Sequence, residues 1–199
     1  MKKTLAILAT LLAVVTAGCS AEATPEPGGG EAAAPSLHTL REAAGIPDCP
    51  DPEPRDQVLG GLPDVTLSCL GSDRSLNLTE LPSGPKIINI WAQWCPPCRQ
   101  EAPYLASFAK AAEGKVALLG VDYNDPNPEL AIEFAGLSEW TYPHLADNDR
   151  RLATELGVTG VPTSVFVAED DTIAYIHVGP FVDENHLRML TKKYLGVTV

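Results

Sequence analysis

Apolar residues along the chain recur with two periods, one typical of strands and the other typical of helices. The block 87–92 is apolar and β-branched and predicts a buried strand, whereas the block 96–112 has the spacing of an amphipathic helix. By the same criteria we expect strands at 65–70, 75–78, 87–92, 116–122, 142–145, 164–169 and 173–179, and helices at 37–44, 96–112, 128–137, 148–156 and 183–195. Strands that alternate with helices, followed by a hairpin and a last helix, predict an α/β fold with a mixed central sheet and helices on both faces.

Short polar residues and glycines mark the ends of several predicted elements. Asn127 and Asp183 stand where a capping side chain is expected before two of the helices, and Gly196 stands where the last helix should stop. We interpret a further set of acidic residues as turn or cap residues rather than as a metal site: Asp122, Asp125, Asp147 and Asp149.

The first residues have the pattern of an export signal. Lys2-Lys3 is followed by an apolar stretch, Leu5–Val15, which is too short for a spanning helix, and then by Thr16-Ala17-Gly18-Cys19. A cysteine directly after Ala-Gly resembles the bacterial lipoprotein signal, although Leu is usual where Thr16 stands. We therefore expect residues 1–18 to be a signal peptide and Cys19 to carry lipid. An ordinary cleaved signal and an uncleaved anchor are the alternatives.

Composition divides the rest of the chain into three parts. Residues 19–36 are small residues, Pro and Gly, and predict a flexible tether. Residues 37–61 have little apolar periodicity and are expected to form an N-terminal extension that is stapled to the domain. The periodic pattern begins near Leu62, so residues 62–199 are expected to form the main domain.

The net charge of −12 limits the partners of the protein. Nothing in the sequence resembles a basic stripe, so we expect no binding to nucleic acid. The same charge disfavours attraction to anionic lipid headgroups, so membrane contact is expected through the lipid anchor only. The expected location is the outer face of the bacterial cytoplasmic membrane.

Outside the cytoplasm disulfides persist, which changes how the five cysteines are interpreted. With Cys19 set aside, Cys95 and Cys98 are one helical turn apart and well placed to pair, which leaves Cys49 with Cys69. The wide spacing of Cys49 and Cys69 favours a structural disulfide over a second redox pair.

The tetrad Cys95-Pro96-Pro97-Cys98 lies at the junction between a predicted strand and a predicted helix. The amides at a helix N-terminus favour negative charge, so Cys95 is expected to be an exposed, nucleophilic thiolate and Cys98 a more buried resolving thiol. Half a zinc site is the alternative, but no second pair has the spacing of a zinc finger. We expect neither a metal nor a cofactor.

Two motifs resemble the thioredoxin superfamily. Trp91-Ala92-Gln93-Trp94-Cys95-Pro96-Pro97-Cys98-Arg99 is similar to its active-site signature, and Gly160-Val161-Pro162-Thr163 is similar to its cis-proline loop. Gln100-Glu101-Ala102-Pro103 and an insertion of about 25 residues before the second motif resemble the TlpA/ResA-like branch of thiol–disulfide oxidoreductases. The resemblance covers about 62–196. It implies a thioredoxin-like fold with an N-terminal β-hairpin extension and an αβ insertion.

The resemblance also implies roles for individual residues. Val161-Pro162 would be a cis bond whose neighbouring backbone pairs with substrate, and Trp94 would shape the surface beside the nucleophile. Glu101 would accept a proton from Cys98, although a glutamate in a first helical turn can simply complement the helix dipole. The buried Asp of thioredoxins corresponds here to Asn89, which cannot titrate.

The expected function is therefore reduction of disulfides in exported proteins, including apocytochrome c before haem attachment, with electrons from a membrane donor. The nearest alternative is an oxidase that forms disulfides. Two prolines between the cysteines supply no polar or basic residue to depress the thiolate pKa strongly, which favours the reductase. A non-catalytic client-binding module is the alternative from another class. A peroxidase would require a peroxidatic Thr-x-x-Cys arrangement, and the reactive motif here is Trp94-Cys95-Pro96-Pro97-Cys98 instead.

Overall fold

The computed structural model describes residues 34–199. The expected signal peptide 1–18, the expected lipidation residue Cys19 and most of the tether 19–36 lie outside the described residues. Within residues 34–199, no helix combines the length and the apolar character that crossing a bilayer requires.

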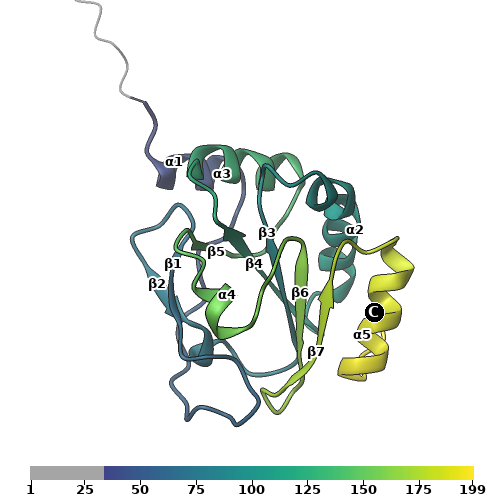
Figure 1. Cartoon of the computed structure of the whole chain (residues 1–199). Coiled ribbons are helices and arrows are strands. Elements are labelled where there is room, and N and C mark those ends of the chain that lie inside the picture. Colours follow the sequence, from purple (N-terminus) through teal and green to yellow (C-terminus); the bar gives the residue numbers. More distant parts are fainter. Residues whose placement is uncertain (1–33) are drawn as a thin grey trace, which may run out of the picture. The chain divides into compact units, whose positions relative to one another are not determined.

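Seven strands form one mixed sheet in the order β2-β1-β5-β4-β3-β6-β7 (Figure 1). Strands β3, β4 and β5 are parallel to one another, and the pairs β3–β6, β6–β7, β1–β5 and β1–β2 are antiparallel. The expected mixed sheet is confirmed. The strands are β1 (Thr66–Cys69), β2 (Ser75–Asn77), β3 (Lys86–Trp91), β4 (Ala117–Tyr123), β5 (His144–Asp147), β6 (Thr163–Val167) and β7 (Ile173–Val178).

The helices follow the sequence pattern, two of them with the expected bounds. They are α1 (Leu37–Ala43), α2 (Pro96–Ala112), α3 (Pro128–Leu137), α4 (Arg151–Glu155), α5 (Glu184–Leu195) and a short 3-10 helix, η1 (Leu78–Glu80). The side chain of Asp183 caps α5 by accepting the amide of His186, and Gly196 ends the helix in the left-handed conformation. Asn127 is the N-cap residue of α3, as expected, but its side chain makes no capping hydrogen bond.

Two elements begin at least two residues later than the sequence predicts, for local reasons. Strand β5 begins at His144 rather than at Tyr142, because Pro143 has no amide hydrogen to give to the ladder. Helix α4 begins at Arg151 rather than at Asn148, because both carboxylate oxygens of Asp147 accept amides of the first turn, from Arg151 (2.8 Å) and Leu152 (2.9 Å).

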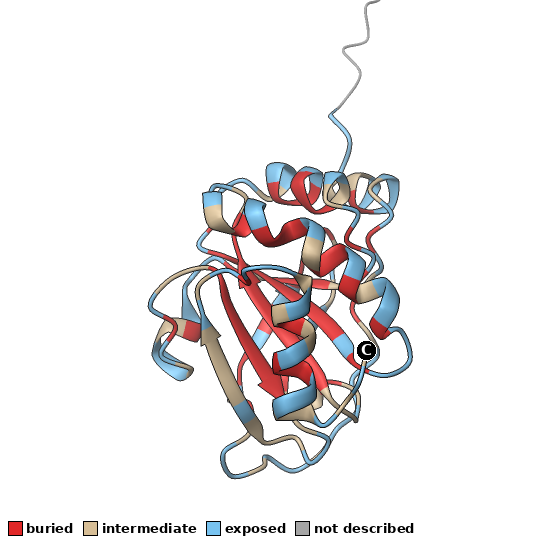
Figure 2. Cartoon of the chain, turned by 90° about the vertical axis from the view of Figure 1, so that its right-hand side faces the viewer, coloured by how far each residue is buried: buried red, intermediate tan, exposed pale blue. Residues whose placement is uncertain are grey.

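The two faces of the sheet are covered unequally. Ile87 and Trp91 of β3 pack into a core with helices α1, α2, α3 and α5, whereas Ile88 and Ile90 pack against η1, α4 and the segment before β1. Figure 2 shows the buried strands behind the helices. The α2 face has one position where only glycine is possible: a Cβ on Gly120 would lie 1.8 Å from Nδ1 of His144, the residue opposite it on β5.

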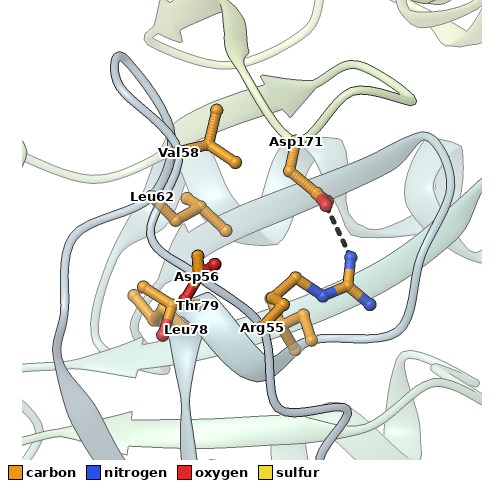
Figure 3. Close-up of a pocket in the computed structure, with 8 residues that line it drawn as sticks. Arg55, Asp56, Val58, Leu62, Leu78, Thr79 and Asp171 are labelled. Carbon is orange, nitrogen blue, oxygen red and sulfur yellow. Dashed lines mark hydrogen bonds and ion pairs between the residues drawn. The ribbon is translucent and has the colours of Figure 1, made fainter.

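The contacts that fasten the N-terminal extension to the domain include a covalent bond and a group of ion pairs. The covalent bond is the Cys49–Cys69 disulfide, beside which Arg74 donates to the carbonyl oxygens of Cys49 (2.8 Å) and Pro50 (3.2 Å). The ion pairs form a cluster in which Asp171, in the turn between β6 and β7, binds Arg55 (2.5 Å) and the nearly buried Lys86 (2.6 Å). Figure 3 shows the Arg55–Asp171 pair at a pocket lined by residues of this extension.

Candidate functional site

The end of β3 turns directly into α2, and Cys95 is the N-cap of that helix. The amide of Cys95 donates to the carbonyl of Ala92 (3.1 Å), which closes the turn. The Sγ of Cys95 accepts the amide of Cys98 at 3.2 Å. Pro96 and Pro97 have no amide hydrogen, so among the first three helical residues Cys98 is the one that can stabilise negative charge on this sulfur.

Cys95 and Cys98 form a disulfide across the first turn of α2. The expectation that Cys95 is exposed is wrong for this disulfide form, because its exposed fraction is 2%, against 0% for Cys98. The carbonyl oxygen of Val161, from the loop before β6, lies 3.5 Å from the Cys95 sulfur and covers it. Trp94, which is 46% exposed, forms the open surface beside the disulfide.

The loop that covers the disulfide contains the cis Val161–Pro162 peptide bond. The antiparallel register of β6 with β3 places Thr163 opposite Ile90, so the loop lies next to the end of β3. The amide of Gly179 donates to the carbonyl of Pro162 (2.9 Å), which anchors the loop to the end of β7. This fixes the backbone of Val161 beside the sulfur.

Glu101 lies in α2, one turn beyond Cys98, and is 1% exposed. Burial raises the pKa of its carboxyl group to about 7, and hydrogen bonds from the Phe181 amide (3.0 Å) and the Asn89 side chain (2.9 Å) only partly oppose that shift. Asn89 also donates to the Ser164 hydroxyl (3.1 Å), so Glu101 is connected to the strand that follows the cis-proline loop.

An aromatic cluster forms the floor below the disulfide. Trp91 packs edge-on against Trp140 and His144, with ring centroids 5.0 and 5.4 Å apart, and its indole nitrogen donates to Nδ1 of His144 (3.2 Å). Burial lowers the pKa of His144 to about 3, so this histidine is neutral. This aromatic cluster is therefore uncharged.

Asp122 and Asp125 lie near the turn that leads to Cys95, and sequence reasoning assigned them no functional role. Asp125 is a turn residue that accepts the amides of Gln93 (3.3 Å) and Asn127 (3.0 Å). Asp122 is neither a turn nor a cap residue but part of β4, 1% exposed, and burial, followed by the charge of Asp125, raises its pKa to about 8. The available signal was a carboxylate within a strand predicted to be buried.

One group among the described residues has the ligand spacing of a metal site, namely Asp48, Cys49 and Cys69. Its two sulfur atoms are bonded to each other, so they offer no thiolate ligands in this form.

A thioredoxin-like fold with a disulfide across the first turn of a helix and a cis-proline loop beside it defines a thiol–disulfide oxidoreductase. Residues 59–190 match the family model described as Redoxin, and the chain belongs to this family. The probable thiol:disulfide interchange protein DsbE-2 of Pasteurella multocida is 33% identical over 140 residues, which cover 67% of this chain and 71% of that protein.

Two further likenesses agree with this assignment. The thioredoxin-like protein YneN of Bacillus subtilis is 30% identical over 119 residues, which cover 59% of this chain and 69% of that protein. The solved structure of a DsbF homologue from Corynebacterium diphtheriae superposes with a TM-score of 0.60 at 24% identity, over 67% of this chain and 85% of that one, and this likeness shows the fold. The resemblance to the TlpA/ResA-like oxidoreductases is confirmed.

Proposed function

We propose that the chain is a lipid-anchored reductase that acts outside the cytoplasmic membrane on disulfides of exported proteins. The observation that carries the proposal is the position of Cys95, whose sulfur is an N-cap acceptor, is bonded to Cys98 and is covered by the Val161 carbonyl. These are the contacts that a dithiol centre needs in order to react at one sulfur and be resolved by the other.

In the reducing direction the Cys95 thiolate attacks one sulfur of a client disulfide. The new Cys95–client bond forms as the client disulfide breaks, and the departing client thiolate takes a proton. Cys98 then loses its proton and attacks the Cys95 sulfur, which releases the second client thiol. The product is the Cys95–Cys98 disulfide present in the structure, and a membrane dithiol donor must reduce it again.

Client binding is assigned to the surface around the nucleophile. The half-exposed Trp94 offers an aromatic contact, and the Val161 backbone beside cis-Pro162 offers hydrogen-bonding groups to an extended client segment. Disulfide-containing segments of exported proteins, such as apocytochrome c, have the required chemistry.

Glu101 is proposed as the proton acceptor for Cys98. A carboxyl group with a pKa near 7 can take up and return a proton at neutral pH, and Glu101 follows Cys98 by one turn of the same helix. Asn89, at the position of the thioredoxin aspartate, cannot do this and instead orients the Glu101 carboxyl group through its side-chain amide.

The direction of electron flow is proposed from the two prolines. One amide stabilises the Cys95 sulfur, and neither Pro96 nor Pro97 adds a donor, so the thiolate is stabilised moderately. A moderately stabilised thiolate favours a low reduction potential, typical of reductases. A measured potential of about −120 mV, as in strong oxidants, would contradict the reducing direction.

Trapping of clients tests the proposed exchange directly. In the Cys98→Ala variant, Cys95 should accumulate mixed disulfides with exported proteins, visible as thiol-sensitive adducts on non-reducing gels and identified by mass spectrometry. The matched control is Cys95→Ala, which should trap none. Equal adducts in both variants, or none in either together with no turnover of the wild-type protein, would rule out the proposed chemistry and favour a client-binding module.

A further inference from the structure

The turn that presents Cys95 is held by the segment that follows β4. Gln93 donates its amide to Oδ2 of Asp125 (3.3 Å), and Trp94 donates its indole nitrogen to the carbonyl oxygen of Asn124 (3.2 Å). Gln93 and Trp94 are the two residues between Ala92 and Cys95. Asn124 and Asp125 therefore hold the two residues that precede Cys95.

A buried carboxyl group lies next to this segment. Asp122 is 1% exposed, and neither of its oxygens has a hydrogen-bond partner among the described residues. The charged neighbour that acts on Asp122 is the carboxyl group of Asp125, three residues further along the chain, and it has no hydrogen to donate while it is ionised. Two neighbouring carboxylates in a buried site repel each other, but one shared proton converts the repulsion into a hydrogen bond.

The surroundings provide no other compensation for a second negative charge. The residues beside Asp122 on the adjacent strands, Trp91 and Ala146, carry no charge. The other titratable or charged groups packed on this face include Glu101 and the two cysteines of α2, the neutral His144 of β5, the buried Tyr142 hydroxyl, and the guanidinium groups of Arg41 and Arg99. Within residues 34–199 no lysine, arginine or histidine forms an ion pair with Asp122 or Asp125.

We propose that Asp122 and Asp125 are positioning residues for thiol–disulfide exchange, which hold one proton between them and thereby keep the Gln93–Trp94 turn and Cys95 in the reactive place. This inference rests on the proposed function. When Asp122 loses the shared proton, Asp125 is repelled and the turn that it holds through the Gln93 amide shifts. The added negative charge also opposes the approach of an attacking thiolate, so both effects slow the reaction at Cys95.

The decisive variant is Asp122→Asn, whose amide can donate to Asp125 at every pH. We would measure the rate of reduction of the Cys95–Cys98 disulfide by dithiothreitol between about pH 6.5 and about pH 9.5. The ratio of the wild-type rate to the Asp122→Asn rate cancels the ionisation of the reductant. This rate ratio should be constant at the acidic end of the pH range. As the pH rises it should fall several-fold, through a step centred near the pKa of Asp122, about 8.

Two matched variants assign that step. When both proteins also carry Glu101→Gln, the step in the rate ratio should persist, because it arises from Asp122 and not from Glu101. In Asp125→Asn it should move to lower pH, because the neighbouring charge that helps to raise the pKa of Asp122 is removed. The inference would be overturned if the ratio of the wild-type rate to the Asp122→Asn rate stays constant over the whole pH range. It would also be overturned if the Asp122→Asn rate itself falls through the same step as the wild-type rate.

A titration of the oxidised wild-type protein separates this inference from the proposed function. In this form the cysteines do not titrate, and the ¹³C resonance of the Asp122 carboxyl group should shift near pH 8. Titration near the ordinary value of about 4 would overturn the inference even if exchange is active. Titration near pH 8 in a protein without exchange activity would support the shared proton and reject the proposed function instead.

Discussion

Single residues in this protein owe their chemistry to burial as much as to their type. Glu101 would be an ordinary surface carboxylate on an isolated helix, yet between α2, Asn89 and the Phe181 amide its pKa rises to about 7. The pKa of His144 shifts in the opposite direction, to about 3, because burial also penalises the charged form of this side chain. Both shifts favour neutral side chains in the core below the disulfide.

The shift of Glu101 predicts a dependence of stability on pH. Its folded pKa of about 7 lies above the ordinary value of 4.5, so between these values the folded protein binds more protons than the unfolded chain. The free energy of unfolding should therefore fall as pH rises through this window, by roughly 3 kcal/mol from this group. Urea unfolding of the oxidised protein at a series of pH values measures the slope.

Glu101→Gln should remove this part of the slope and leave the part due to Asp122. Glu129 lies exposed in the first turn of α3, and Glu129→Gln provides the matched control, which should retain the wild-type slope. Identical pH profiles for the wild-type and Glu101→Gln proteins would show that the buried carboxyl group does not carry the shift.

At the scale of elements, the site depends on how β3, α2 and the loop before β6 meet. The register of β6 with β3 places cis-Pro162 beside the N-terminus of α2, and the N-terminal extension contributes no residue to this junction. The helix α1 of the extension packs against α3, and the segment that follows it packs on β1 and on the opposite face of the sheet through Cys49. Stability and exchange chemistry are therefore assigned to different elements.

Removal of the Cys49–Cys69 disulfide tests this separation. The two cysteines are 20 residues apart in sequence, and in the chain-entropy model a loop of this size stabilises the fold by about 3 kcal/mol. The double variant Cys49→Ala/Cys69→Ala should lose about that much in urea unfolding. Its rate of Cys95–Cys98 reduction should equal the wild-type rate at temperatures where it is folded. A large loss of rate in the folded variant would instead indicate a second redox pair.

The sequence predicted those parts of the fold and site that depend on local signals. The bounds of α2 and α3 follow from the prolines and apolar spacing at their ends, and Cys95, Cys98 and Pro162 lie in short motifs. The burial of Cys95 depends on the Val161 carbonyl, a contact between segments 66 residues apart. The hydrogen bond from the Gln93 amide to Asp125 joins segments 32 residues apart, and periodicity does not reveal such a contact.

At the scale of the whole molecule, the net charge of −12 disfavours electrostatic binding to an anionic membrane, so the proposed location needs an anchor. A lipid on Cys19, with the segment 19–36 as a tether, would provide it, in line with the small, Pro- and Gly-rich composition of that segment. This arrangement would hold the domain of residues 62–199 near a membrane electron donor while leaving its client surface free.

Cys19→Ser should release the proposed anchor. We expect the wild-type protein in the membrane fraction and the Cys19→Ser protein outside it, with unchanged disulfide-reductase activity in detergent-free assays. Mass spectrometry of the membrane-bound protein should show a mass increase on an N-terminal peptide that begins at Cys19. A wild-type protein without lipid would contradict the anchor and favour an ordinary cleaved signal.

The ion-pair cluster of Arg55, Lys86 and Asp171 has a practical consequence. Lys86 begins β3 and Cys95 follows its end, so the strand separates this cluster from the sulfur. The β6–β7 turn that carries Asp171 also contains the exposed Glu169. A fluorescent protein or an affinity peptide inserted beside Glu169 would thus sit at the pole away from the clients, so that exchange could be followed in living cells without obstructing the sulfur.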